Sequence, residues 1–227
     1  MKKGVIFDMD GTMFDTESIY EKGWELMAHR YNQVYNPEFQ IAACGTTGET
    51  MRRIVREFYP GIDVENFIKD CSKWVEEQVK INLPEKPGLH EILDYVKGQG
   101  YKMAVASGSR KEMLLHNLKK AGIYDMFDAI ASGHEVEHGK PAPDVFLLAA
   151  ERLGLKPEEC YVIEDGANGV RAGAAAGCDV IMVPDLVEAD DEMRKITVGI
   201  FDSLSEVKKA LEENSDISLN WLKCVEF

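Results

Sequence analysis

The feature that most constrains this chain is an apolar run that ends on two aspartates. Residues 5–7 are Val-Ile-Phe; Asp8 and Asp10 follow, and Gly11 marks a turn. Such a run is typical of a buried strand that ends at the edge of a sheet. In an extended chain, positions i and i+2 project to the same side, so the two carboxylates can share one metal ion or one reacting group. A plain surface turn also favours aspartate and glycine, and the pair alone leaves both interpretations open.

Two later apolar runs end in a similar way. Residues 161–163 lead into Glu164 and Asp165, and residues 103–106 lead into Ser107. Lys140 lies in a separate loop with the sequence Gly-Lys-Pro-Ala-Pro-Asp. An isolated lysine is usually solvated, but a proline excludes the residue before it from the helical region, so we expect an extended loop from which this lysine reaches inward.

From residue 87 onward, helical and strand patterns alternate. Helices are expected at residues 89–96, 111–121, 144–153 and 168–176, and strands at residues 102–106, 129–130, 161–164 and 180–183. Glycines 100, 122, 154 and 177 stand where these helices should end, and proline 143 stands where one should begin. Alternation of this kind predicts an α/β fold with a parallel sheet covered by helices.

Residues 16–86 break this alternation. Their apolar positions recur at helical spacing and show no strand pattern. We therefore expect a core of residues 1–15 and 87–227 that carries an all-helical insertion at residues 16–86. The alternative is that these helices extend the core. Trp24 and Trp74 fit the hydrophobic interior of the insertion better than a stacking surface for a ligand.

Composition excludes some partners. The formal net charge of −14 argues against nucleic acid, whose phosphates require a basic surface. A small phosphorylated substrate stays compatible, because a metal ion and one or two lysines supply local positive charge. The five cysteines show no zinc-binding spacing, which fits reduced thiols in a cytoplasm. No apolar stretch has the length of a membrane span or of a signal peptide. We expect a cytoplasmic monomer without membrane partners.

Four motifs together point to one family. Read in order, DxDGT, SGS, GKPAPD and EDGANG resemble the motifs of the haloacid dehalogenase superfamily and, within it, the β-phosphoglucomutase-like phosphatases. The similarity runs from about residue 3 to about residue 184. It implies a Rossmann-like parallel-sheet core with an inserted all-helical cap domain, and a phosphatase that acts on a small phosphorylated metabolite. Oxygen ligands and phosphate chemistry favour Mg²⁺ over zinc as the cofactor.

The resemblance also implies the catalytic roles. Asp8 is expected to be the nucleophile that becomes an aspartyl phosphate, and Asp10 the general acid and base. Lys140 is expected to pair with Asp8 and with the phosphoryl group. The metal would be held by the Asp8 side chain, the backbone carbonyl of Asp10, Glu164 and Asp165.

Phosphate binding is expected at the SGS motif as well as at Lys140. Ser107 would bind through its hydroxyl, and Gly108 through its N–H at the opening of the next helix. A helix N-cap is the rival interpretation for Ser107 and the favoured one for Ser109. Asn168 is expected either to support the metal loop or to cap the helix that follows it.

Residues of the insertion are expected to contact the substrate, namely Thr16, Tyr20, Thr46 and Thr47. Mutases of this subfamily place a histidine shortly after the DxDG loop and cations around a cap loop. Here Tyr20 stands near the first position, hydroxyls and Glu49 occupy the loop, and Arg52 and Arg53 lie a turn further on. This favours hydrolysis of a sugar phosphate over a β-phosphoglucomutase-type phosphohexomutase.

Two other functions are disfavoured. The dehalogenase branch lacks the second aspartate and the metal, whereas Asp10 and both later acids are present here. A non-catalytic phosphate-binding regulator should have lost Asp8 or Asp10, and neither is lost.

Overall fold

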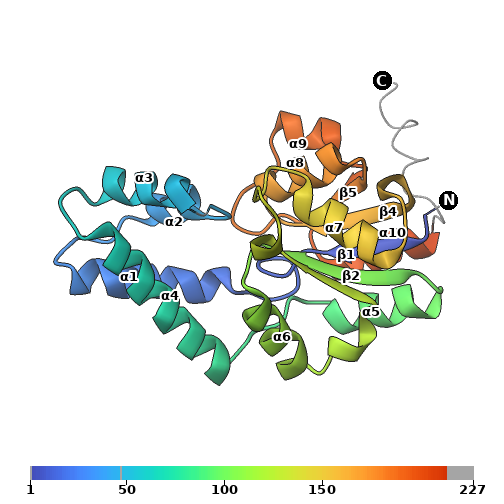
Figure 1. Cartoon of the computed structure of the whole chain (residues 1–227), viewed down its shortest axis with the longest axis horizontal. Coiled ribbons are helices and arrows are strands. Elements are labelled where there is room, and N and C mark those ends of the chain that lie inside the picture. The colour runs from blue at the N-terminus through green and yellow to red at the C-terminus, as the bar shows by residue number, and fades with distance from the viewer. Residues whose placement is uncertain (1, 47, 214–227) are drawn as a thin grey trace. The chain divides into compact units, whose positions relative to one another are not determined.

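The chain forms two compact units in the computed structural model, which describes residues 2–46 and 48–213 (Figure 1). One unit comprises Met1–Phe14 and Glu85–Phe227, and the other comprises Asp15–Pro84. No helix among the described residues is long and apolar enough to cross a membrane.

The first unit is built on a six-stranded sheet in which every pair of neighbouring strands is parallel. The order of the strands across the sheet is β3-β2-β1-β4-β5-β6. The strands are β1 (Gly4–Phe7), β2 (Lys102–Ser107), β3 (Ala129–Ser132), β4 (Cys160–Glu164), β5 (Asp179–Met182) and β6 (Gly199–Ile200). The predicted α/β class with a parallel sheet is confirmed.

Strand β1 lies in the middle of this sheet. All of its residues are buried, as suits a strand that is covered on both faces. Phe7 pairs with Val105 of β2 on one side and with Ile163 of β4 on the other. The strand order reverses at β1, and in open α/β sheets ligands bind beyond the carboxyl ends of the strands at such a point. The residues that follow β1, β2 and β4 therefore meet at one edge.

Helices cover both faces of the sheet (Figure 1). Helices α7, α8 and α9 pack on one face, where Ile6 and Val162 lie in the same apolar cluster as Phe146 and Val170. Helices α5 and α6 pack on the strands from the other face, and α10 packs on α5. The helices of this unit are α5 (Leu89–Gly98), α6 (Lys111–Lys120), α7 (Asp144–Leu153), α8 (Ala167–Ala176), α9 (Asp191–Ile196) and α10 (Leu204–Glu213).

The helices and strands predicted after residue 87 are all present, with ends that differ by one or two residues at most. Gly154 and Gly177 end α7 and α8 in the left-handed conformation, as their positions predict. The elements α9, β6 and α10 were not predicted.

The second unit is helical. It consists of α1 (Glu17–Arg30), α2 (Pro37–Ala43), α3 (Gly48–Phe58) and α4 (Val64–Ile81). Its interior is aromatic: Trp24 stacks on Phe67 with ring centroids 5.7 Å apart and meets Phe39 edge-on at 5.2 Å. Trp24 is therefore a core residue, as predicted, whereas Trp74 is only half-buried.

Candidate active site

The loop after β1 brings Asp8 and Asp10 to the carboxyl edge of the sheet. The Asp8 amide donates to the Ile163 carbonyl at 2.9 Å, which continues the ladder with β4 by one residue. The chain then turns back at Gly11, whose φ of +84° favours glycine. A Cβ at Gly11 would also collide with the carboxylate of Asp165. Glycine is thus required here both by its backbone conformation and by the close approach of an acid.

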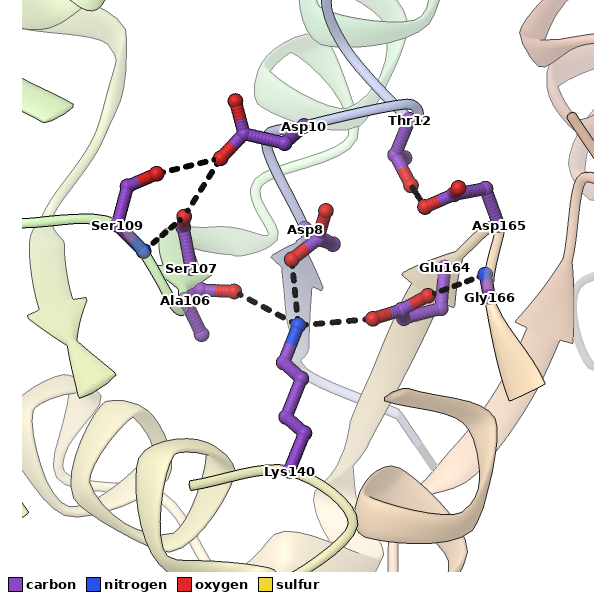
Figure 2. Close-up of polar contacts among 10 residues, drawn as sticks. All are labelled: Asp8, Asp10, Thr12, Ala106, Ser107, Ser109, Lys140, Glu164, Asp165 and Gly166. Carbon is purple, nitrogen blue, oxygen red and sulfur yellow. Dashed lines mark hydrogen bonds and ion pairs between the residues drawn. The ribbon is translucent and has the colours of Figure 1, made fainter. Parts of the chain in front are cut away.

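Lys140 lies at the centre of the site (Figure 2). Its Nζ is 2.5 Å from Oδ1 of Asp8 and 2.8 Å from Oε1 of Glu164, and it donates to the carbonyl of Ala106 at 3.5 Å. The lysine side chain is only 12% exposed, and its Nζ lies 4.8 Å from the centre of the Phe146 ring. The structure therefore places this lysine inward, against Asp8, the acid for which the family resemblance implies the role of nucleophile.

The charges of this cluster are strongly coupled. Burial raises the pKa of Asp8 well above its usual range; Lys140 opposes this effect, while Glu164 and Asp10 add to it. Burial by itself lowers the pKa of Lys140, but the carboxylates of Asp8 and Glu164 outweigh burial and hold that pKa above its ordinary value. One lysine thus balances only part of the negative charge that the site gathers.

Three carboxylates are arranged to hold a cation. Asp8, Glu164 and Asp165 are buried, and each offers an oxygen within 4.8 Å of the others. The Gly166 amide donates to Oε2 of Glu164 at 2.7 Å, and the Thr12 hydroxyl donates to Oδ1 of Asp165 at 3.0 Å. These bonds orient the acids, and an oxygen-only ligand set suits a hard divalent cation. The residues present therefore fit a divalent metal ion.

The side chain of Asp10 lies apart from these three carboxylates, next to the loop after β2 (Figure 2). Its Oδ2 accepts hydrogen bonds from Ser107 Oγ at 3.1 Å and from Ser109 Oγ at 2.8 Å. The Ser109 amide in turn donates to Ser107 Oγ at 2.9 Å. The two aspartates after β1 therefore contact different groups: Asp8 contacts the ammonium group of Lys140, and Asp10 contacts the hydroxyls of two serines.

The start of α6 corrects two predictions. This helix begins at Lys111, and its N-cap position is Arg110 rather than Ser109. The hydroxyl of Ser109 bonds to Asp10 instead, so the N-cap interpretation of Ser109 is wrong. For the same reason, Gly108 lies in the loop ahead of the helix and not at its opening.

The capping interpretation of Asn168 is also wrong. Helix α8 begins at Ala167, and its N-cap position is Gly166. Site roles for Thr12 and Gly169, and the contact of Ser109 with Asp10, were not predicted from the sequence. Gly169 lies so close to Glu164 that a Cβ there would overlap the carboxylate. The signal for Thr12 was its place in the DxDGT motif, whereas the contacts of Ser109 and Gly169 arise only in the folded chain.

The substrate residues expected in the insertion lie in the helical unit. The carbonyl of Thr16 accepts from the amides of Ile19 and Tyr20 at the start of α1. The ring of Tyr20 stacks on Trp24 with centroids 5.9 Å apart. The Thr46 hydroxyl donates to the backbone carbonyl of Ala43 at 2.8 Å. Thr47 lies outside the described residues.

Comparisons with known proteins agree with the four motifs. The model of the haloacid dehalogenase-like hydrolase family matches residues 5–183. A phosphorylated carbohydrates phosphatase of Thermotoga maritima is 32% identical over 183 residues, which are 79% of this chain and 83% of that protein. A fructose-1-phosphate phosphatase of Escherichia coli is 34% identical over 183 residues, which are 79% of this chain and 95% of that protein.

A solved structure has a similar fold. The crystal structure of a candidate β-phosphoglucomutase from Thermotoga maritima matches with a TM-score of 0.75 and 29% identity, covering 94% of this chain and 99% of that one. The motifs, the site geometry and these matches agree. The chain is therefore an enzyme of the haloacid dehalogenase-like hydrolase family, in its β-phosphoglucomutase-like branch of phosphatases and phosphomutases.

Proposed function

We propose that this protein is a Mg²⁺-dependent phosphatase that hydrolyses a small sugar phosphate through an aspartyl-phosphate intermediate. The observation that carries the proposal is the separation of the two aspartates: Asp8 contacts buried Lys140, whereas Asp10 is bonded to two hydroxyls. A nucleophile benefits from a cation that also binds the phosphoryl group, and an acid-base catalyst must act at a different atom. The two relatives named for phosphorylated carbohydrates and fructose 1-phosphate support the substrate class.

The reaction has two steps in this proposal. In the first step, a carboxylate oxygen of Asp8 bonds to phosphorus, the bond from phosphorus to the sugar oxygen breaks, and Asp10 gives its proton to that oxygen. Lys140, Ser107 and the Gly108 N–H bind the phosphoryl oxygens. In the second step, a water oxygen bonds to phosphorus, the bond from phosphorus to the Asp8 oxygen breaks, and a proton of the water passes to Asp10. Phosphate leaves, and Asp8 is restored.

The metal would be held by the carboxylates of Asp8, Glu164 and Asp165 and by the carbonyl of Asp10. Bound there, Mg²⁺ supplies positive charge that offsets the clustered acids and the charge on the phosphoryl oxygens. The buried positions of these three carboxylates, with oxygens within 4.8 Å of one another, support this assignment.

We propose that the helical insertion, residues 16–86, acts as a cap that selects the substrate. Thr16, Tyr20, Thr46 and Thr47 are the residues proposed to contact the sugar.

Two arginines of the cap already have acidic partners. Arg52 contacts Glu65 at 2.5 Å and Glu49 at 3.9 Å, and Arg56 contacts Glu49 at 2.7 Å. Exposed ion pairs are weak, so the arginines can be drawn away, but the acids beside them repel a second phosphate. A phosphohexomutase has to bind a sugar bisphosphate, and these acids therefore favour hydrolysis.

The proposal is tested with a panel of sugar phosphates, measuring phosphate release in the presence of Mg²⁺. Asp8→Asn should abolish release, and so should EDTA, with recovery when Mg²⁺ is added back. Asp94→Asn is the matched control, because Asp94 is exposed on α5 and should leave the rate unchanged. Hydrolysis at the wild-type rate by Asp8→Asn or in EDTA would contradict the covalent mechanism or the metal assignment, respectively.

A second assay separates the two functions of the family branch. The enzyme is incubated with β-glucose 1-phosphate and a trace of the 1,6-bisphosphate, and both glucose 6-phosphate and free phosphate are measured. We expect free phosphate to dominate. Rapid formation of glucose 6-phosphate with little free phosphate would establish the phosphohexomutase instead.

A further inference from the structure

The loop after β2 holds the Asp10 carboxylate with two hydroxyl groups (Figure 2). Ser107 and Ser109 both donate to Oδ2 of Asp10, at 3.1 Å and 2.8 Å. Each hydroxyl has one proton and makes one such donation at a time. The proposed function assigns the Ser107 hydroxyl to the phosphoryl group. Asp10 and a bound phosphoryl group therefore compete for the proton of Ser107, whereas the bond from Ser109 is exempt from this competition.

Ser109 is held in place through its backbone as well. Its amide donates to Ser107 Oγ at 2.9 Å, and its carbonyl accepts from Ser132 Oγ at 2.7 Å. Ser132 is fully buried at the end of β3. The two loops also pack closely, because a Cβ on Gly133 would lie 3.1 Å from the Cα of Gly108. The Ser109 hydroxyl is thus preorganised toward Asp10 and needs no rearrangement to stay bonded when Ser107 turns away.

We propose that Ser109 is a positioning residue for Asp10. It keeps the carboxylate at the β2 edge of the site while the hydroxyl of Ser107 turns to the phosphoryl group. Both hydroxyls bond to the same oxygen of Asp10, Oδ2. Without Ser109, Oδ2 of Asp10 and the phosphoryl group share the one hydroxyl proton of Ser107, and the carboxylate is held less firmly. The inference rests on the proposed function, because that function gives Asp10 its proton transfers.

The test measures kcat/KM of Ser109→Ala on simple phosphate monoesters without a sugar, from 4-nitrophenyl phosphate to alkyl phosphates. Poor leaving groups need the proton from Asp10, whereas 4-nitrophenolate leaves without it. We expect a loss of roughly tenfold to a hundredfold on alkyl phosphates, the range for one lost hydrogen bond to a charged group. Little loss is expected on 4-nitrophenyl phosphate. Ser109→Thr keeps a hydroxyl and should recover most of the lost rate.

Two controls separate positioning from a general structural effect. Ser205→Ala, on an exposed position of α10, should match the wild type on every ester. In an Asp10→Asn background, Ser109→Ala should cause no further loss on alkyl phosphates. An equal loss across all leaving groups, or an additional loss in the Asp10→Asn background, would overturn the inference. The proposed function is tested separately by the wild type. If the wild type with Mg²⁺ hydrolysed none of the esters, that function would be refuted, whatever the kcat/KM values of the variants relative to one another.

Discussion

Replacing Gly169 with alanine is expected to displace the Glu164 carboxylate and to destabilise the core unit. Gly169 lies in the first turn of α8, and a Cβ at this position would occupy the space that the carboxylate fills. The carboxylate would have to move and give up its contact with Lys140 at 2.8 Å and the hydrogen bond from the Gly166 amide at 2.7 Å.

The size of the effect follows from these contacts. Breaking a buried ion pair costs about 3–5 kcal/mol, and glycine to alanine within a helix returns about 0.5–1 kcal/mol. The free energy of unfolding should therefore fall by about 2–4 kcal/mol. For a chain of this size, that loss lowers the Tm by roughly 4–16 °C.

Urea unfolding followed by circular dichroism measures the stability, and titration calorimetry measures the affinity for Mg²⁺, which should fall as well. Gly98→Ala in α5 is the matched control, because no atom lies within 4 Å of a Cβ at that position. It should raise the stability by at most about 1 kcal/mol. If Gly169→Ala were as stable as the wild type and bound Mg²⁺ equally well, the close approach of Glu164 would have no energetic role.

Two further substitutions test other parts of the chain. Hydrogen bonds from Arg152, with a contribution from Lys111, lower the pKa of Glu135 from 4.5 to about 2. The ionised Glu135 side chain therefore stabilises the folded protein fully above pH 4.5, and this contribution is lost as the pH falls toward 2. Glu135→Gln should lower the free energy of unfolding by about 1–2 kcal/mol at pH 7, and this difference in urea unfolding should vanish toward pH 2; a constant difference would contradict the pKa. Phe67→Ala removes a fully buried aromatic ring and should lower the free energy of unfolding by about 3–5 kcal/mol, measured by unfolding followed by tryptophan fluorescence. Phe67→Leu should lower it clearly less.

The sequence predicted the core sheet well because its strands are short apolar runs that are buried on both faces. Strand β4 is an example, since every residue from Cys160 to Glu164 is buried. Strand β6 was missed because Gly199–Ile200 is only two residues long and has no pattern to recognise. Helix α10 does carry a signal, because its buried positions Leu204, Val207 and Leu211 recur at helical spacing.

The acids at the strand ends could be predicted for a similar reason, because parallel strands bring their carboxyl ends to one edge. The partner of Ser109 could not be predicted. Serine is common at N-caps, but α6 begins two residues later, and the hydroxyl bonds instead to an aspartate from a distant part of the chain. At this position, a tertiary contact outweighs the local preference of serine for an N-cap. The roles given to Thr16, Tyr20, Thr46 and Thr47 stay predictions.

The pairing of β1 has a consequence for how this enzyme is made. Gly4 pairs with Lys102 and with Cys160, which the ribosome adds much later. Contacts so distant in sequence form slowly, because a long loop must close before they stabilise anything. The contacts of the helical unit are more local, and we expect that unit to form first. A nascent chain arrested before β2 should therefore carry an ordered helical unit, while its first strand stays unpaired until β2 and β4 have been made.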